Sequence, residues 1–334
     1  MTGAPPMTEP FLLSPALKSR IWGGDRAVRL YGRELSPDGT AAAEYWECSS
    51  RTDGPSTVCG GRFDGMSLGR LLDICPEITG GRFDGSTFPV LFKVIDAGQK
   101  LSVQVHPGDS YAAEHENGQL GKTECWYVID AEPGAYVICG FREGVGRETA
   151  AEAMRSGGIE PLLKKIPVRR GSLIPVGAGT VHAIGGGILI AEIQENSDLT
   201  YRIYDWGRLG TDGKPRRLDT GKASEVTVFP GDGIPGGEPD AGFRADPDAG
   251  EGRFSCRYFT LDVLRCRGGM TLAPGGGCCI LFCVSGRCGI TARTPSGEMS
   301  ETLEVGAGKT AFIPAGAENL YVGGNCGILY IHGF

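Results

Sequence analysis

The sequence predicts an all-β fold with small helical insertions, and three observations support this prediction. The chain has 334 residues, more than twice the ~150 residues of a typical domain, so it can form two cores or one extended β architecture. Its 55 glycines and 21 prolines indicate many turns and therefore many short elements. Runs rich in β-branched and aromatic residues, bounded by Gly, Pro or Asp, recur along the chain. We therefore expect two β domains.

The first half of the chain alternates predicted strands with a few short helices. Ser67 is a candidate N-cap for a short helix that extends to Asp73. Residues 88–106 contain two β-rich runs separated by Asp-Ala-Gly-Gln, which has the composition of a turn, so a hairpin is predicted. Helices are predicted at 149–155 and 161–166, with Ser-Gly-Gly between them. Further strands are predicted at 124–130, 135–141, 172–175 and 187–194.

A segment with almost no residues that can pack, Gly231 to Gly252, is predicted to be a linker or surface loop. It separates an expected first domain, residues 1–230, from a second β domain, residues 253–334. Regular spacing of short apolar runs after the linker is typical of a β-sandwich or barrel. Six strands are predicted there, at 254–266, 278–284, 289–292, 301–305, 310–313 and 326–331.

Composition excludes several classes of function. The 33 basic and 40 acidic residues give a net charge of −7 without a long run of like charge, so no nucleic-acid partner is expected. No stretch of ~18 uncharged apolar residues is present, so no membrane span is expected. The N-terminal residues lack a basic start followed by an apolar core, which predicts a cytoplasmic protein. The twelve cysteines are therefore expected to be reduced thiols that pack as small hydrophobic residues.

Polar side chains alternate with apolar ones in two of the predicted strands. In Leu-Ser-Val-Gln-Val-His, the two-residue period of a strand places Ser102, Gln104 and His106 on one face. In Gly-Lys-Thr-Glu-Cys-Trp, the same period places Lys122 and Glu124 on one side. Each polar row is expected to face a barrel interior or a cleft.

A histidine follows a third strand, in Pro-Val-Gly-Ala-Gly-Thr-Val-His, where His182 stands at the expected strand rim. Gln104, His106, Glu124 and His182 together form a nitrogen and oxygen donor set that suits Zn²⁺ or another first-row divalent ion. Either histidine alone is more simply explained as a satisfied core or rim residue. Three polar rows in the same half of the chain favour a site.

The segment from Ala191 to Arg208 is the third informative block. If it stays extended, four of its polar side chains share one face. They are an acid/base candidate (Glu192), a carboxamide (Gln194), a hydrogen-bonding carboxylate (Asp198) and a cation (Arg202). The alternative is an exposed strand edge with salt bridges between these side chains.

Four ordered segments resemble type I mannose-6-phosphate isomerases in their short bacterial form. They are Leu-Ser-Val-Gln-Val-His-Pro, Gly-Lys-Thr-Glu-Cys-Trp-Tyr, Pro-Val-Gly-Ala-Gly-Thr-Val-His-Ala-Ile-Gly and Glu-Ile-Gln-Glu-Asn-Ser-Asp-Leu-Thr-Tyr-Arg-Ile-Tyr-Asp-Trp. The resemblance covers about residues 10 to 210 and is weak after about residue 225. It implies a catalytic cupin (jelly-roll) β-barrel domain and a second cupin-like β-barrel domain without a metal motif.

The resemblance also implies the residues of an active site. One catalytic Zn²⁺ per chain is implied, held by Gln104, His106, Glu124 and His182. Further active-site residues are implied at the family's motif positions, namely Lys122, Glu192, Asp198 and Arg202. Candidates for binding the substrate are Ser102, Lys122 and Arg202. The long enterobacterial form has a histidine immediately before the motif lysine, whereas this chain has Gly121, so that histidine's role does not transfer.

The expected function is interconversion of mannose 6-phosphate and fructose 6-phosphate through a cis-enediol. Glu192 is the preferred proton shuttle and Lys122 the second choice, and the sequence leaves both open. An alternative function is a non-catalytic, metal-containing cupin that binds sugar phosphates or regulates another process. An iron-dependent oxygenase is disfavoured, because the Gln-His-Glu-His set differs from a triad of two histidines and one carboxylate. The only expected partner is a small sugar phosphate, and the sequence predicts no oligomeric state.

Overall fold

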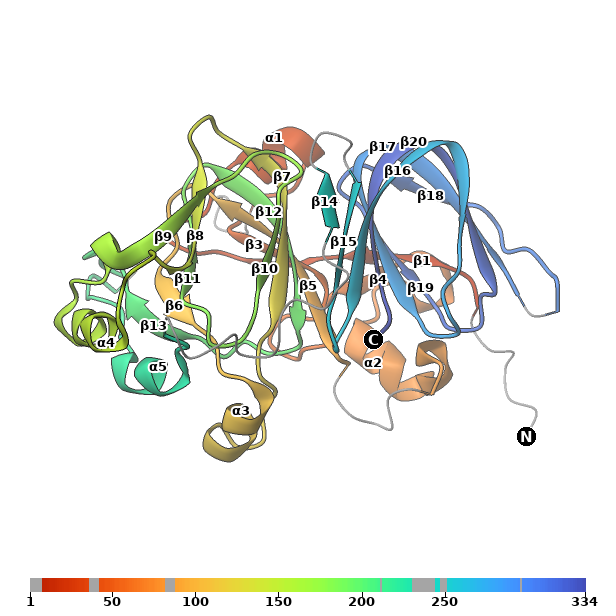
Figure 1. The fold of residues 1–334 in the computed structure, drawn as a ribbon. Helices are drawn as coiled ribbons and strands as arrows, with labels where there is room; N and C mark the ends of the chain where they lie inside the picture. Colours follow the sequence, from red (N-terminus) through yellow and green to blue (C-terminus); the bar gives the residue numbers. More distant parts are fainter. Residues whose placement is uncertain are drawn as a thin grey trace. The chain divides into compact units, whose positions relative to one another are not determined.

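The computed structural model describes residues 8–35, 42–81, 88–210, 212–229, 244–246, 251–294 and 296–334, and Figure 1 shows the fold. Two compact units are present. The first combines Met1–Leu17, Tyr45–Lys93 and Gly242–Phe334, and the second combines Lys18–Glu44 and Val94–Ala241. Strands dominate both units, which confirms the predicted all-β fold with small helical insertions.

Two sheets build the region around the predicted site. The six-stranded sheet has the order β10 (Leu173–Val176), β7 (Glu124–Ala131), β12 (Ile188–Glu195), β5 (Val90–Ala97), β3 (Glu44–Cys48) and β2 (Ala16–Lys18). The five-stranded sheet has the order β13 (Tyr201–Tyr204), β6 (Val103–Val105), β11 (His182–Ile184), β8 (Tyr136–Phe141) and β9 (Leu163–Pro167). The predicted strands at 124–130, 135–141, 172–175 and 187–194 are therefore present.

A hydrophobic core joins the inner faces of these two sheets. Trp126 and Ile190 of the six-stranded sheet belong to the same buried cluster as Val137 and Ile184 of the five-stranded sheet. Side chains from two facing sheets form a core of this kind in β-sandwiches and barrels. Polar residues that point between the sheets consequently lie inside the barrel.

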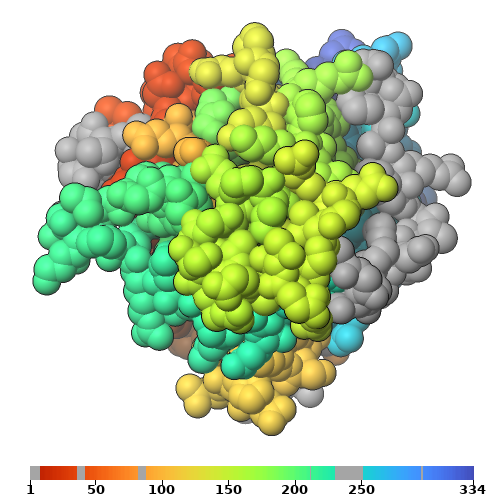
Figure 2. Space-filling model, turned by 60° about the vertical axis from the view of Figure 1, so that its left-hand side comes forward, coloured from red at the N-terminus to blue at the C-terminus, as the bar shows by residue number. Residues whose placement is uncertain are grey.

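Short helices cover the outer face of the five-stranded sheet. The helices α4 (Arg147–Ser156) and α5 (Thr220–Val226) contribute Met154 and Ala223 to a buried cluster that also contains Val103 and Val105. In Figure 2 this face is towards the viewer. Further helices are α1 (Arg26–Tyr31) and α3 (Asp109–His115). The apolar side of β6 is thus taken up by helix packing, which leaves its polar side for the barrel interior.

The first compact unit contains a nine-stranded sheet. Its main order is β14 (Arg244–Asp246), β15 (Glu251–Ser255), β16 (Thr260–Leu272), β20 (Asn319–His332), β17 (Cys279–Arg293), β19 (Thr310–Ile313), β1 (Phe11–Ser14) and β4 (Thr57–Cys59). The strand β18 (Leu303–Gly306) pairs with β17 off this path. The same unit also carries η1 (Gly61–Phe63), α2 (Leu68–Ile74) and η2 (Pro76–Thr79). The predicted cap is present, because the Ser67 side chain accepts a hydrogen bond from the Arg70 amide.

The compact units do not follow the predicted segments 1–230 and 253–334. β1 pairs with β19 on one side and with β4 on the other, so N-terminal strands complete the sheet formed by the C-terminal residues. Most of the predicted linker, 231–252, lies outside the described residues, and its residues 244–246 form β14.

The strands of the C-terminal part are longer than predicted. The runs at 278–284 and 289–292 belong to one strand, β17, whose register with β20 shifts between Cys283 and Ser285. The run at 254–266 is divided between β15 and β16. Local composition marked the apolar stretches, but glycines such as Gly286, with a φ of 76°, bend the strand without ending it.

The predicted hairpin at 88–106 is wrong. β5 belongs to the six-stranded sheet and β6 to the five-stranded sheet, so the connection crosses from one sheet to the other. Asp96 accepts a hydrogen bond from the amide of Ala27, and a Cβ at Gly98 would come within 2.5 Å of the Gly23 carbonyl oxygen. The small residues in Asp-Ala-Gly-Gln therefore allow this segment to pack closely against the backbone of residues 23–27.

The predicted helix at 161–166 is also wrong. Only the short η3 (Glu160–Leu162) is helical, and β9 follows it. Val137 pairs with Ile166 and Phe141 with Leu163, so pairing with β8 overrides the local preference.

Two expectations from composition can be compared with the described residues. All twelve cysteines are free thiols, and most of them are buried. Among the helices that the structure describes, none is long and apolar enough to cross a membrane.

Candidate metal and sugar-phosphate site

One strand aligns the polar residues of the five-stranded sheet. In β6, Val103 and Val105 are buried in the helix-covered cluster, whereas Gln104 lies between them. Gln104 is the Cα partner of His182 on β11 and of Arg202 on β13. The predicted alternation is confirmed, and the sheet register places these three side chains in one row across three strands.

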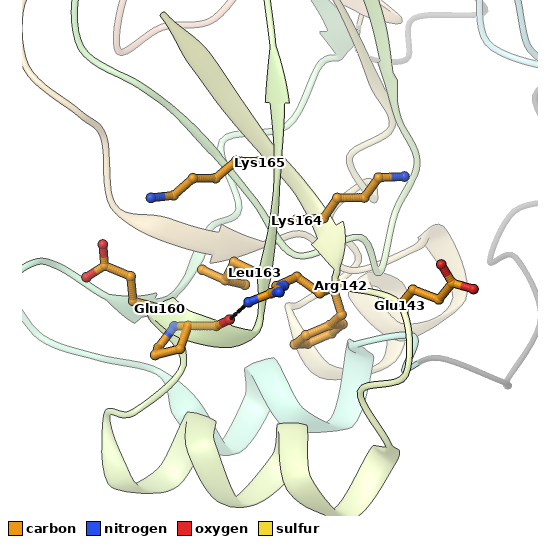
Figure 3. A pocket seen from close by; sticks show the side chains of 8 residues that line it. Arg142, Glu143, Glu160, Leu163, Lys164 and Lys165 are labelled. Atoms are coloured by element: carbon orange, nitrogen blue, oxygen red, sulfur yellow. Dashed lines mark hydrogen bonds between the residues drawn. The ribbon is translucent and has the colours of Figure 1, made fainter. Parts of the chain in front are cut away.

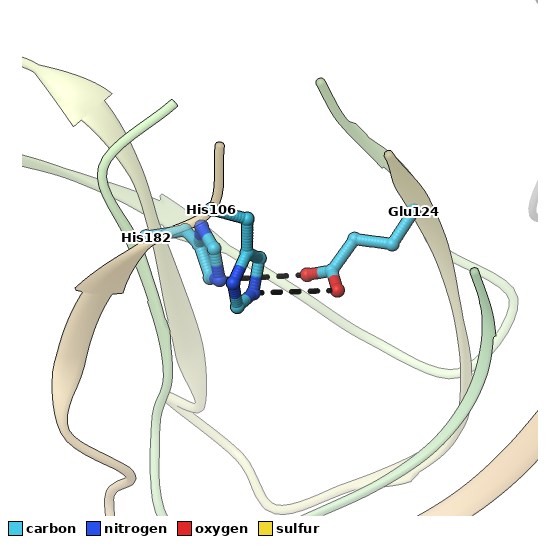
Figure 4. A group of neighbouring side chains, drawn as sticks. All are labelled: His106, Glu124 and His182. Carbon is cyan, nitrogen blue, oxygen red and sulfur yellow. Dashed lines mark ion pairs between the residues drawn. The ribbon is translucent and has the colours of Figure 1, made fainter. Parts of the chain in front are cut away.

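His106, Glu124 and His182 could together hold a metal ion. In the described part of the chain, no other group of three or more His, Cys, Asp or Glu residues could do so. One ligand atom from each lies within 4.8 Å of the others, and all three side chains are buried. His106 Nε2 is 3.7 Å from Glu124 Oε2, and His182 Nε2 is 3.4 Å from Glu124 Oε1. Figure 4 shows both imidazole rings turned towards the carboxylate. The amide nitrogen of Gln104 lies 3.3 Å from His182 Nε2, at the same place.

Backbone carbonyls orient both imidazole rings. His106 Nδ1 lies 2.7 Å from the carbonyl oxygen of Leu199, and His182 Nδ1 lies 2.8 Å from that of Thr180. An Nδ1–H that donates to a carbonyl leaves the lone pair on Nε2, the nitrogen that faces Glu124. Burial lowers the pKa of His182 to about 4, so its ring is neutral, as a metal ligand must be.

The donor chemistry fits a divalent metal ion. Glu124 Oε1 is buried and accepts no hydrogen bond in the described part of the chain. A buried carboxylate oxygen without a donor is costly unless a cation compensates it. Two imidazole nitrogens, a carboxylate and an amide oxygen are ligands that Zn²⁺ and other first-row divalent ions accept. Gln104, His106, Glu124 and His182 therefore suit such an ion.

A lysine and a second carboxylate border this group. Lys122 Nζ lies 3.1 Å from Glu124 Oε2 and 3.9 Å from Glu192 Oε1. Trp126 Nε1 donates a 3.0 Å hydrogen bond to Glu192 Oε2. Burial alone lowers the pKa of Lys122, but Glu124, Glu192 and Asp198 outweigh it and raise the pKa. The ammonium and the Glu192 carboxylate are both buried beside the candidate metal ligands.

The predicted continuous row from Glu192 to Arg202 is wrong. β12 ends at Glu195 and β13 begins at Tyr201 in the other sheet, so the chain turns between them. Gln194 is buried, and its amide group donates hydrogen bonds to the carbonyl oxygens of Glu195 and Ser197 in this turn. Gln194 thus stabilises the turn, while Asp198 is exposed within it.

Arg202 lies on β13, where its Nε donates a 3.3 Å hydrogen bond to Ser102 Oγ. Its Nη1 donates to the carbonyl oxygen of Arg217. Burial, and then the charge of Arg216, lower the pKa of Arg202. The contact joins two of the three predicted substrate-binding residues.

The turn after Arg202 is bound to the backbone just before β6, close to the contact between Arg202 and Ser102. Asp205 accepts hydrogen bonds from Arg208 and Arg216. Trp206 has a φ of 60°, a rare conformation for a residue other than glycine, and donates a 2.7 Å hydrogen bond to the carbonyl oxygen of Leu101. This turn was not predicted, although the Tyr-Asp-Trp-Gly-Arg segment that forms it is a visible sequence signal.

A surface hollow elsewhere contains none of the predicted site residues. It is lined by Phe141, Arg142, Glu143, Glu160, Pro161, Leu163, Lys164 and Lys165. Figure 3 shows Lys164 and Lys165 pointing in opposite directions, as neighbours on a strand do. Its charges do not converge, so the buried group around Glu124 is the better candidate site.

Comparison with known proteins assigns the chain to a family. Residues 11–132 match the family model "Phosphomannose isomerase type I, catalytic domain". The mannose-6-phosphate isomerase of Streptococcus mutans is 42% identical over 223 residues, which are 67% of this chain and 69% of that protein. The chain belongs to the type I phosphomannose isomerase family. The mannose-6-phosphate isomerase ManA of Bacillus subtilis has the same identity and coverage.

A solved member of the family shares the fold. The crystal structure of a mannose 6-phosphate isomerase from Bacillus subtilis matches with a TM-score of 0.84 and 31% identity, over 97% of this chain and 99% of that chain. The match confirms the predicted architecture of cupin-like β-barrels.

Proposed function

We propose that the chain is a zinc-dependent mannose-6-phosphate isomerase that interconverts mannose 6-phosphate and fructose 6-phosphate through a cis-enediol. The observation that carries the proposal is the convergence of Glu192, Lys122 and the group His106–Glu124–His182 in the interior of the barrel. A binding protein needs the anion-binding groups but not a buried carboxylate beside the metal ligands, so this arrangement favours an enzyme.

Gln104, His106, Glu124 and His182 are the residues that would hold the ion. When bound, Zn²⁺ supplies electrostatic stabilisation of the negative charge that develops on the O1 and O2 oxygens during proton transfer. The hydrogen bonds that His106 and His182 donate to the carbonyl oxygens of Leu199 and Thr180 set the ring orientation before any ion binds.

The isomerisation moves one proton between C2 and C1 of the sugar. In the proposed mechanism, Glu192 removes the proton from C2 of mannose 6-phosphate while O1 takes up a proton, which gives the cis-enediol. Glu192 then returns its proton to C1 while O2 releases one, so the net change moves one proton from C2 to C1 and one from O2 to O1. Trp126 Nε1 orients the Glu192 carboxylate through its hydrogen bond of 3.0 Å, which leaves Oε1 of Glu192 as the basic atom. Lys122, which is 3.9 Å from that oxygen, binds a substrate hydroxyl or carbonyl oxygen.

Arg202 and Ser102 are proposed to bind the substrate as a pair, with the phosphate as their target. Arginine presents a planar fork of donors that matches phosphate oxygens, and the Ser102 hydroxyl adds a donor beside it. Asp198, exposed in the turn between β12 and β13, is proposed to act at the mouth of the site through its charge effect on Lys122.

The test is a coupled assay of fructose 6-phosphate formation from mannose 6-phosphate, run with and without a chelator. We expect activity in the purified protein, its loss after chelation and its return when zinc is added back. Metal bound without any turnover would instead support a non-catalytic sugar-phosphate-binding cupin.

A further inference from the structure

The segment that carries Lys122 has no regular secondary structure. It runs between α3, which ends at His115, and β7, which begins at Glu124. Within residues 119–123, β12 contributes a backbone hydrogen bond from the Glu195 amide to the Thr123 carbonyl oxygen at 3.1 Å, but it does not bind the Lys122 amide. Something else must place the Lys122 ammonium beside Glu124 and Glu192, since lysine has a flexible four-carbon side chain.

Two carboxyl groups bind the backbone on either side of Lys122. The amide of Gly121 donates a 3.0 Å hydrogen bond to Asp109 Oδ1, and the amide of Thr123 donates a 2.7 Å hydrogen bond to Glu195 Oε1. The amide of Lys122 itself donates to the carbonyl oxygen of Pro107 at 3.0 Å. Three consecutive amides are thus held, two of them by side chains from outside the segment.

The two carboxyl groups also contact each other. The charge of Asp109 and a side-chain hydrogen bond with it are among the causes that raise the pKa of Glu195. Glu195 is only 2% exposed, and burial, followed by the charge of Asp109, raises its pKa to about 8. Asp109 lies on α3 and Glu195 at the end of β12, so the segment between Gly121 and Thr123 is held between two regular elements.

The residue at position 121 is part of this arrangement. A Cβ at Gly121 would lie 2.5 Å from the amide nitrogen of Asp109 and 2.6 Å from the carbonyl carbon of Gly108. Backbone atoms at these distances exclude any side chain. Position 121 therefore requires glycine, because the segment packs directly on the start of α3.

We propose that Asp109 and Glu195 are positioning residues that hold the Gly121–Thr123 backbone and thereby place the Lys122 ammonium for substrate binding. The proposal rests on the proposed function in one respect, namely that Lys122 binds the substrate. Neither carboxyl group touches the substrate in this arrangement. Both act through Lys122.

A double-mutant cycle tests the proposal in the full-length, zinc-loaded protein. Glu195→Ala removes the acceptor for the Thr123 amide, and we expect kcat/KM for mannose 6-phosphate to fall roughly tenfold to hundredfold, the scale of an ångström-sized misplacement. Glu195→Gln keeps an oxygen acceptor and a donor for Asp109, so it should restore near wild-type kinetics. In a Lys122→Ala background, Glu195→Ala should cost less than threefold, because its effect passes through Lys122.

The matched control is Asp96→Ala. Asp96 is a buried carboxylate that accepts a 2.7 Å hydrogen bond from the Ala27 amide, so its loss destabilises the same unit without touching the Lys122 segment. We expect a lower melting temperature but unchanged kcat/KM. An equal loss of kcat/KM in Asp96→Ala, or full additivity of Glu195→Ala with Lys122→Ala, would overturn the positioning role.

Hydrogen exchange gives a readout that does not depend on activity. The peptide that covers residues 119–124 should exchange at least tenfold faster in Glu195→Ala than in the wild type, and at the wild-type rate in Glu195→Gln. Unchanged exchange in Glu195→Ala refutes the proposal even if kinetics change. If the wild type did not isomerise mannose 6-phosphate, the proposed function would fail, whereas the exchange data would still decide whether the backbone is held.

Discussion

Glu192→Gln is the most informative single substitution at this site. Glutamine has nearly the same volume as glutamate, and its carbonyl oxygen still accepts the hydrogen bond that Trp126 Nε1 donates at 3.0 Å. Lys122 loses a contact of 3.9 Å but keeps its 3.1 Å contact with Glu124. The fold and the metal ligands are therefore retained, and the change removes essentially only the base.

The expected loss follows from the role assigned to Glu192. General-base groups typically contribute ~10²–10⁴ to a rate, which corresponds to about 2.7–5.4 kcal/mol. The orienting hydrogen bond is worth less, about 1.5–3 kcal/mol for a charged acceptor. We therefore expect Glu192→Gln to lower kcat at least ~10²-fold, and Trp126→Phe to have a smaller effect.

The assay follows the transferred proton as well as the product. Exchange of the C2 proton of mannose 6-phosphate with deuterated solvent, measured by NMR, should fall together with isomerisation, while zinc content stays at the wild-type level. Arg202→Lys is the contrasting variant, because it keeps the charge but loses the planar fork, so KM should rise while exchange in bound substrate continues. Near-normal exchange in Glu192→Gln would assign the base to Lys122. Undiminished exchange in both Glu192→Gln and Lys122→Ala would remove both groups from the proton transfer.

Three further predictions concern the metal and pH. His106→Ala and His182→Ala should each lose bound zinc and activity, as measured by plasma mass spectrometry and the coupled assay, and full retention of either would contradict the assigned ligands. The protein should contain about one equivalent of zinc per chain, and an anomalous-scattering peak beyond residue 253 would show a second site. The pKa of Glu195 is raised to about 8, so the folded protein holds a proton that the unfolded chain loses near pH 4.5, and this contribution to stability declines as pH rises between those values. Urea unfolding of chelated samples should therefore show that the free energy of unfolding of Glu195→Gln rises relative to that of the wild type between pH 5 and pH 8. An equal difference between the two proteins at both pH values would refute the raised pKa of Glu195.

Local pattern was sufficient for many of the elements. Strand alternation in Val103–Gln104–Val105 predicted which side chain faces the interior, because one face of the strand is covered by helices and the other is not. The strand at Thr310–Ile313 was predicted with its observed bounds. In contrast, residues 88–106 and 161–166 were misassigned because their conformation depends on partners far away in the chain. A turn composition does not reveal that Gly98 packs on Gly23.

The site was predictable to the extent that its chemistry resides in side chains. Two histidines and a glutamate, which lie on or directly after three separate strands, were identified from the motifs, and the structure brings their ligand atoms within 4.8 Å of one another. Domain membership was harder, because β1 adds to a sheet whose other strands lie mostly beyond residue 250. No pattern within residues 11–14 states which strand they will pair with, since any exposed sheet edge accepts an apolar strand.

The orientation of the histidines shows why side-chain motifs alone leave a metal site incomplete. His106 and His182 are held by the carbonyl oxygens of Leu199 and Thr180, and every residue type has such a carbonyl. The sequence therefore carries no signal for these partners, although they decide which ring nitrogen faces Glu124. The carbonyl group of residue 199 reaches His106 only if the backbone path of the turn between β12 and β13 is preserved. Gln194 stabilises this turn by donating hydrogen bonds to the carbonyl oxygens of Glu195 and Ser197. Gln194, which was expected in the catalytic row, thus acts on the site indirectly, by holding the backbone that orients His106.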